Sequence, residues 1–165
     1  PQHIRERDFR AHSLAESFLH AWDGLSYIYH TQRNMRIHIF IASLVLSACI
    51  VLGLDRIEFL MVTLAILGVL SAEILNTLTE SLVDLIEPEY NLVAKMIKDV
   101  AAAGVLLTAA FSVIIGLIAF YPALGNFPGV LHDFARYRWP YLLVQILVFV
   151  LPSLWGMIKD GNRGL

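Results

Sequence analysis

Four long apolar segments alternate with shorter polar stretches along the chain. They cover residues 37–54, 59–85, 100–121 and 141–158, and the second of them carries several acidic and amide side chains. Each is close to or above the roughly 17–25 residues that a helix needs to cross a bilayer. Because lipid cannot hydrogen-bond to the backbone, a spanning segment of this kind must be helical. The pattern therefore predicts four transmembrane helices, with a loop between the last two, where residues 122–140 hold three prolines and two glycines.

A different pattern precedes the first apolar segment. Between Leu14 and Tyr29 the apolar residues recur at helical spacing, and polar residues such as Glu16, His20 and Asp23 lie between them. Ser13 followed by Glu16 three residues later is typical of a capping box at the start of a helix. We predict an amphipathic helix on the membrane surface, although a helix packed against a soluble partner has the same pattern. Residues 1–12 are predicted to form an N-terminal tail.

The composition agrees with a membrane protein. The 165 residues are 58% hydrophobic and 16% charged, with a mean hydropathy of +0.67, whereas a soluble domain carries about 25% charged residues. A net charge of −2 gives no indication of nucleic-acid binding. The single cysteine, Cys49, lies in an apolar run, which excludes a disulfide framework. The fold class predicted is an all-α integral membrane protein.

Basic residues predict the orientation of the spans, because they are enriched in cytoplasmic loops. Several arginines precede the first span, two lysines separate the second and third, and Arg56 alone separates the first and second. We predict that the N-terminus, the second loop and the C-terminal tail are cytoplasmic, while Arg136 and Arg138 fall on the opposite side. The basic residues predicted to be cytoplasmic are Arg5, Arg7, Arg10, Arg33, Arg36, Lys95, Lys98, Lys159 and Arg163.

The second span carries a stripe of polar side chains. At about 100° per residue, these side chains project within about 60° of Glu73 around the helix axis. Ionised acids that face lipid are costly, so the stripe must face protein, water or a cation. A stripe of interhelical hydrogen bonds would be the purely structural interpretation, but three acids in register favour a functional site. The stripe consists of Glu73, Asn76, Thr77, Glu80 and Asp84.

Lys95, Lys98 and Asp99 begin the third span at the membrane level of Glu80 and Asp84. The lysines could serve only as topology signals, but they are also well placed to meet phosphate oxygens. Acids beside lysines suggest a magnesium ion, which prefers oxygen ligands, together with a nucleoside triphosphate. The chain has neither a P-loop motif nor a protein-kinase signature, so a nucleotide site would be of another type.

Four motifs resemble those of the small prokaryotic lipid kinases that phosphorylate diacylglycerol or undecaprenol with ATP. Residues 73–84 (E-I-L-N-T-L-T-E-S-L-V-D) resemble the family's E-x-x-N-[ST]-x-x-E-x-x-x-D helix, and residues 95–102 (K-M-I-K-D-V-A-A) resemble its A-K-D-x-A-A stretch. Residues 33–38 (R-N-M-R-I-H) and 21–25 (A-W-D-G-L) are similar to its first-span and surface-helix motifs. The resemblance covers residues 13–121 and is closer to the undecaprenol kinase branch.

The resemblance implies a homotrimer in a prokaryotic inner (plasma) membrane, with active sites shared between subunits. Each subunit would have an amphipathic surface helix and a three-span core over residues 13–121. Residues 122–165, with the extra loop and the additional C-terminal span, have no counterpart in the family pattern. By resemblance, Glu73 would be the general base on the lipid hydroxyl, Asn76 would orient the reacting groups and Glu80 would bind Mg²⁺. By the same resemblance, ATP would be bound by Lys98, Asp99, Lys95 and His20.

One departure from the family pattern bears on the metal. The family has a metal-binding Glu where this chain has Gln32, which is neutral and offers one oxygen, so metal affinity should fall. This leaves open an alternative, namely a catalytically weakened member that acts as a structural subunit of a larger membrane complex through its C-terminal span. An ion or proton pathway lined by the three acids is a weaker hypothesis, because the other spans lack deep acids.

Overall fold

The computed structural model describes residues 13–161, which are helical almost throughout. The predicted tail over residues 1–12 and the basic residues Arg5, Arg7, Arg10 and Arg163 lie outside the described residues. The elements are α1 (Leu14–Thr31), α2 (Arg33–Leu52), α3 (Arg56–Ile86), α4 (Leu92–Gly125), α5 (Phe127–Asp133), the π-helical η1 (Phe134–Arg138), α6 (Trp139–Gln145), the π-helical η2 (Ile146–Val150) and α7 (Leu151–Gly161).

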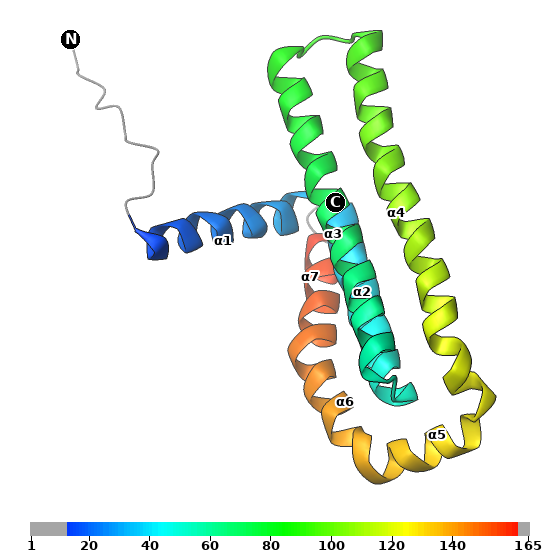
Figure 1. Ribbon diagram of the computed structural model, residues 1–165. Coiled ribbons are helices and arrows are strands. Elements are labelled where there is room, and N and C mark those ends of the chain that lie inside the picture. The colour runs from blue at the N-terminus through cyan, green and yellow to red at the C-terminus, as the bar shows by residue number, and fades with distance from the viewer. Residues whose placement is uncertain (1–12, 162–165) are drawn as a thin grey trace.

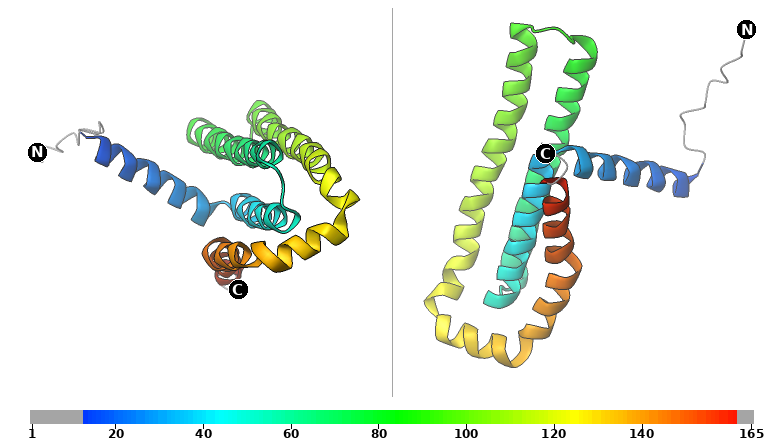
Figure 2. Two further views of the ribbon diagram at one scale, coloured as in Figure 1. Left: turned by 60° about the horizontal axis from the view of Figure 1, so that its bottom comes forward. Right: turned by 180° about the vertical axis from the view of Figure 1, so that it is seen from behind.

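Helix α3 runs antiparallel to both α2 and α4, which point in the same direction, and α3 and α4 form the most extensive contact (Figure 1). The chain then crosses the end of the bundle through α5 and returns along α2 through α6 and α7, so that α2 lies between α3 and the C-terminal helices (Figure 2). Four stretches are long and apolar enough to span a membrane: Arg33–Leu52, Arg56–Ile86, Leu92–Gly125 and Phe127–Trp155. The predicted fold class is confirmed, with a surface-type helix, a three-span core and an additional C-terminal span.

Helix α1 leaves the bundle crosswise to α2 and points away from the spans (Figure 1). Its start is capped as predicted, because the Ser13 hydroxyl accepts a hydrogen bond from the Glu16 backbone N–H at 3.2 Å. Its apolar residues Phe18 and Trp22 are exposed, whereas Ile28, near the junction with α2, is buried. An exposed apolar face on a helix that runs crosswise to the spans is the arrangement expected of a helix lying in the membrane interface.

Helices α3 and α4 extend beyond the start of α2 (Figure 1). With 31 and 34 residues, they are about 46 and 51 Å long at 1.5 Å per residue, which exceeds the roughly 30 Å hydrocarbon layer. Asp55 and Glu58 form a capping box at the start of α3, and Asn91 caps the start of α4. Glu80, Asp84 and Lys98 lie toward the turn of the α3–α4 hairpin, on the part that extends past the start of α2 (Figure 1).

The connection between the third and fourth spans is helical, and the prediction of a loop over residues 122–140 is wrong. Pro128 and Pro140 each occupy the first turn of a helix, where no backbone N–H is needed. The loop is reduced to a turn at Asn126. Pro152 lies two residues after the π-helical η2, inside the C-terminal helical run, where a missing N–H donor disturbs the hydrogen-bond ladder.

The C-terminal helices are joined to α2 by polar contacts at two levels. The Gln145 side-chain amide donates to the Ser43 carbonyl at 2.8 Å, and the Ser47 hydroxyl donates to Gln145 Oε1 at 2.5 Å. At the end of α2, Arg138 donates to the Val51 carbonyl at 3.1 Å. In an apolar environment such contacts are favoured because each group would otherwise be unpaired.

Candidate active site

Glu73 lies in the middle of α3 and is the most deeply buried charged side chain in the described part of the chain, at 2% exposure. Its Oε2 atom has no hydrogen-bond partner. Asn34 and His38 of α2 lie next to it, and apolar residues of α4 line the other side of the pocket. Native structures rarely leave a buried carboxylate oxygen unpaired without a reason. This atom is therefore available to a group that enters from outside the chain.

The predicted polar stripe is graded in exposure along α3. Glu73, Asn76 and Thr77 are buried, Glu80 is partly exposed and Asp84 is exposed. The Asn76 amide donates to Glu80 Oε1 at 2.9 Å, while its own Oδ1 has no partner. Thr77 donates to the Glu73 backbone carbonyl at 3.0 Å, so this hydroxyl is already satisfied within the helix. The buried side-chain atoms of the stripe that lack a hydrogen-bond partner are Glu73 Oε2 and Asn76 Oδ1.

Two ion pairs lie beyond Glu80, on the part of the α3–α4 hairpin that extends past the start of α2. Lys98 of α4 pairs with Asp84 of α3 at 2.5 Å, and Lys95 pairs with Asp99 at 2.8 Å. The Lys98 and Asp84 side chains are 34% and 64% exposed. Solvent-exposed pairs of this kind contribute about 0–1 kcal/mol. Both lysines could therefore exchange a carboxylate for a phosphate oxygen at little cost.

The remaining predicted site residues lie elsewhere on the chain. His20 is on the exposed surface of α1, and Gln32 is at the junction of α1 and α2, where its backbone N–H donates to the Ile28 carbonyl at 2.8 Å. Neither lines the pocket beside Glu73. Within residues 13–161, no three His, Cys, Asp or Glu side chains are grouped closely enough to hold a metal ion. A single chain thus brings Glu73, Asn76 and Glu80 together, without His20 or Gln32.

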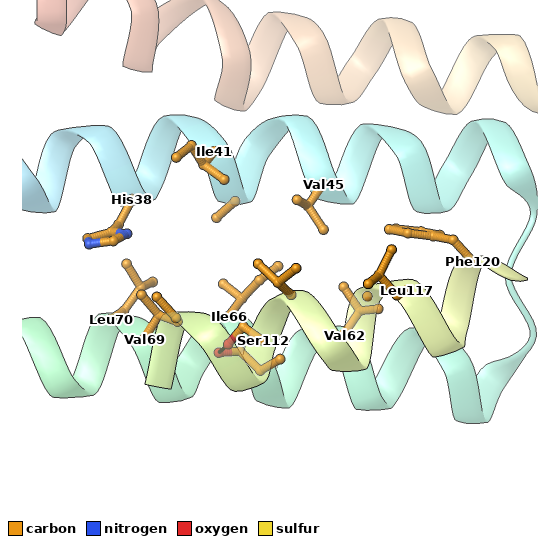
Figure 3. A pocket seen from close by; sticks show the side chains of 15 residues that line it. His38, Ile41, Val45, Val62, Ile66, Val69, Leu70, Ser112, Leu117 and Phe120 are labelled. Atoms are coloured by element: carbon orange, nitrogen blue, oxygen red, sulfur yellow. Dashed lines mark hydrogen bonds between the residues drawn. The ribbon is translucent and has the colours of Figure 1, made fainter. Parts of the chain in front are cut away.

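Two adjoining cavities lie between α2, α3 and α4. The first, here called the polar pocket, has a volume of about 360 Å³ and is lined by Asn34, His38, Glu73, Asn76 and Ala109, among others. The second, the apolar pocket, has a volume of about 380 Å³ and continues past His38 to Phe120 (Figure 3). The sequence pattern gave no separate role to His38 or Asn34, which appeared only as parts of the R-N-M-R-I-H motif. Their i, i+4 spacing puts both on one face of α2, but the direction of that face depends on how α2 packs.

Comparison with known proteins gives the family. Residues 19–120 match the family model described as prokaryotic diacylglycerol kinase. The chain is 43% identical over 115 residues to a diacylglycerol kinase of Synechocystis sp. (strain ATCC 27184 / PCC 6803 / Kazusa), covering 69% of this chain and 66% of that protein. It is 40% identical over 109 residues to the undecaprenol kinase of Bacillus subtilis (strain 168), covering 66% of this chain and 89% of that protein. No solved structure matched the chain.

The chain belongs to the prokaryotic diacylglycerol kinase family. Together with the four apolar helices, this makes it a prokaryotic membrane protein. The family resemblance predicted from the motifs is confirmed. The family model ends at residue 120, so α5, α6 and α7 lie outside the part of the chain that it describes.

Proposed function

We propose that the protein is a lipid kinase that transfers the γ-phosphate of ATP to the hydroxyl group of a membrane lipid. Two relatives are named diacylglycerol kinase and undecaprenol kinase, which supports this reaction class. The observation that carries the proposal is the free, buried Oε2 of Glu73 in a pocket that adjoins an apolar cavity. A lipid alcohol is a poor nucleophile at neutral pH, so a base at this place supplies the chemistry that it needs.

The reaction proceeds as follows in this proposal. The lipid hydroxyl gives its proton to Glu73 Oε2 while its oxygen forms a bond to the γ-phosphorus. The bond between that phosphorus and the oxygen that bridges to the β-phosphate breaks, and ADP leaves with the bonding electrons. Glu73 then returns the proton to solvent. Positioning and charge stabilisation account for most of the catalysis in such transfers, and Asn76 Oδ1, one turn along α3, would help to orient the reacting groups.

The side chains beyond Glu73, toward the turn of the α3–α4 hairpin, have the chemistry needed to bind the triphosphate of ATP. Glu80 has a carboxylate that is partly exposed and oriented by the Asn76 amide, which fits a magnesium ligand, because Mg²⁺ is held by one or two carboxylates and by substrate phosphates. Bound there, Mg²⁺ would offset phosphate charge. Lys98 and Lys95 would bind phosphate oxygens after leaving their carboxylate partners. Asp99 would help to hold the nucleotide.

We further propose that the active site is completed by a neighbouring subunit of a homotrimer. His20 and Gln32 lie outside the polar pocket of their own chain, and α1, which carries His20, extends away from the bundle (Figure 1). Each could therefore serve the pocket of an adjacent copy. The second candidate function, a structural subunit of a larger membrane complex, has only Gln32 and the extra helix in its favour. The kinase names of the relatives do not favour it.

The proposed orientation has both ends of the described chain in the cytoplasm. The start of α2, the α3–α4 turn and the end of α7 lie toward the same side of the bundle (Figure 1), as an even number of spans requires. The Lys95 and Lys98 side chains belong to this side, which agrees with the positive-inside rule. ATP would then reach Glu80 and Lys98 from the cytoplasm.

Transfer of label from ATP marked at its γ-phosphate to lipids tests the proposal. Purified protein in mixed micelles with Mg²⁺ would be given undecaprenol or diacylglycerol. Glu73→Gln should reduce labelled product by about 1,000-fold, since a general base contributes about 10² to 10⁴, while Glu89→Gln, an exposed acid of the α3–α4 turn, should retain activity. Full activity of Glu73→Gln would refute the base assignment. No labelled lipid from folded wild-type protein would refute the kinase.

A further inference from the structure

Helix α2 presents opposite faces to the polar pocket and to the C-terminal helices. Asn34 and His38 line the polar pocket. Ser43 and Ser47 are hydrogen-bonded to Gln145 of α6, and they follow Asn34 and His38, respectively, by nine residues. Nine residues at about 100° each leave two side chains about 180° apart around the helix axis. One wall of the pocket and the contact with α6 are therefore on opposite sides of one helix, which lies between α3 and the C-terminal helices (Figure 2).

The pocket side of α2 is loosely packed. The polar and apolar pockets, with volumes of about 360 and 380 Å³, both lie between α2 and the α3–α4 hairpin (Figure 3). Protein interiors normally contain few voids larger than a water molecule, so α3 and α4 restrain α2 less than a close-packed contact would. The contact of α2 with the helical run from α5 to α7 is more extensive than its contact with α3 and α4 together.

The contact with the C-terminal helices is also directional. Gln145 is buried at 8% exposure, and both polar atoms of its side chain bind one turn of α2. Nε2 donates to the Ser43 carbonyl at 2.8 Å, and Oε1 accepts from the Ser47 hydroxyl at 2.5 Å. Near the end of α2, Arg138 donates to the Val51 carbonyl at 3.1 Å. Two such contacts, about 12 Å apart along the helix, fix its rotation about its own axis and its position along that axis.

The position of α2 determines what lies opposite Glu73. Asn34 and His38 belong to the same rigid helix as the turn that α6 holds, so a shift of that turn displaces both side chains by a similar distance. A misplacement of about 1 Å can lower a reaction rate by about 100-fold. The proposed nucleotide groups, Glu80 and Lys98, belong to the α3–α4 hairpin instead, so a shift of α2 should leave nucleotide binding unchanged.

Building on the proposed kinase activity, we propose that the C-terminal helices hold α2 in the position that phosphoryl transfer requires, and that Gln145 is a positioning residue for the reaction at Glu73. Gln145 acts through α2 and touches neither the lipid nor the nucleotide. The family model ends at residue 120, so this support comes from the part of the chain that the model does not cover. The alternative is a C-terminal span that only stabilises the fold and has no effect on transfer in the folded protein.

The first experiment measures lipid phosphorylation well below the unfolding midpoint of every variant, so that only folded protein is compared. Gln145→Leu should lower kcat by about 10-fold or more and leave the KM for ATP unchanged, because the groups beside Glu73 move and the nucleotide groups do not. The control is Asp55→Ala, which lowers stability by removing the cap of α3 and should keep the wild-type kcat. A wild-type kcat in Gln145→Leu, or the same loss in Asp55→Ala, would overturn the proposal.

The second experiment tests whether Gln145 acts through its contact with α2. Ser47→Ala removes the hydroxyl that donates to Gln145 while the bond to the Ser43 carbonyl remains, and it should lower kcat by about 3-fold. Ser47→Thr keeps the hydroxyl and should retain most of the activity. Added to Gln145→Leu, Ser47→Ala should cost nothing further, since the effects of residues in contact are not additive. Additive losses, or equal losses in Ser47→Ala and Ser47→Thr, would contradict this route.

The third experiment measures the position of α2 without turnover. Spin labels on Leu44→Cys of α2 and Leu75→Cys of α3, both exposed positions, report the distance between the two helices by double electron–electron resonance. The background carries Cys49→Ala, and excess unlabelled protein restricts the signal to pairs within one chain. Gln145→Leu should broaden the distance distribution or shift it by about 1–2 Å, whereas Asp55→Ala should reproduce the wild type. An unchanged distribution in Gln145→Leu would overturn the proposal, and because the measurement needs no ATP, this outcome is distinct from a failure of the kinase activity.

Discussion

The Ser47 hydroxyl and the Gln145 side-chain oxygen are hydrogen-bonded at 2.5 Å, although 98 residues separate them in the chain. Gln145 also donates to the Ser43 carbonyl, and it is buried at 8% exposure. The same helix, α2, carries Asn34 nine residues before Ser43 and His38 nine residues before Ser47, about two and a half turns in each case. The helix that the family model does not cover is therefore hydrogen-bonded to the helix that supplies one wall of the polar pocket.

Gln145→Leu should destabilise the protein. The substitution removes the Gln145 amide that donates to the Ser43 carbonyl and the Gln145 oxygen that accepts from Ser47, and the loss of buried hydrogen bonds costs about 1–3 kcal/mol. The thermal unfolding midpoint in detergent micelles should fall by several degrees, and digestion of the C-terminal helix by protease should become faster. Val144→Leu, at the exposed neighbouring position, is the control and should leave both readouts unchanged. Equal midpoints for wild type and Gln145→Leu would show that the contact between α2 and α6 contributes nothing to stability.

Gly53→Ala should be more damaging than an ordinary glycine replacement. Gly53 ends α2 at a φ of 66°, a left-handed conformation that costs a residue with a Cβ about 1–2 kcal/mol. An added Cβ would also overlap the Arg138 guanidinium, which donates to the Val51 carbonyl. Gly104→Ala lies in the interior of α4 with open space around it and should instead stabilise by about 0.5–1 kcal/mol. Thermal unfolding of the two variants compares them directly, and the same sign for both would contradict this interpretation.

The structure agrees best with the predictions that depended on helical spacing alone. The stripe from Glu73 to Glu80 follows from the geometry of one helix, whereas the burial of Glu73 and the partial exposure of Glu80 depend on the neighbouring helices. The loop predicted over residues 122–140 failed because proline and glycine are compatible with helix starts and ends, as Pro128 and Pro140 show. Composition cannot distinguish a proline in a first helical turn from one in a loop.

Contacts between segments that are far apart in the sequence could not be predicted from the pattern of hydrophobic and polar residues. Gln145 is hydrogen-bonded to Ser43 and Ser47, and these contacts depend on which face of α2 the C-terminal helix covers. The role of His38 depends in the same way on the rotation of α2 against α3. His20 and Gln32 show the reverse, because motif similarity assigned them to the nucleotide side while the single chain leaves them outside the polar pocket.

Gln32→Glu should lower the Mg²⁺ concentration that the enzyme needs. Replacing the neutral amide with a carboxylate adds a charged oxygen ligand at the position where the family has Glu, and the expected shift in half-saturating Mg²⁺ is about 10-fold. Thr31→Glu, the exposed neighbouring position, adds the same charge and controls for a general electrostatic effect. The measurement is lipid phosphorylation across a series of Mg²⁺ concentrations at saturating ATP. If Thr31→Glu produces the same shift, or Gln32→Glu none, position 32 does not bind the metal.

The two lysines at the start of α4 should differ in their effect on ATP. Lys98 pairs across the hairpin with Asp84 of α3 and is less exposed than Lys95, which pairs within its own helix with Asp99. Phosphate held by both helices would be closer to Lys98, so Lys98→Ala should raise the KM for ATP by about 10-fold or more, whereas Lys95→Ala should raise it less.

Asp84→Asn distinguishes a role of Lys98 in phosphate binding from a purely structural role of the ion pair. If Lys98 acts on phosphate, removing its carboxylate partner releases the lysine, and the KM for ATP should stay the same or fall. If the pair only joins α3 to α4, Asp84→Asn and Lys98→Ala should lower the thermal unfolding midpoint equally and leave the KM for ATP unchanged.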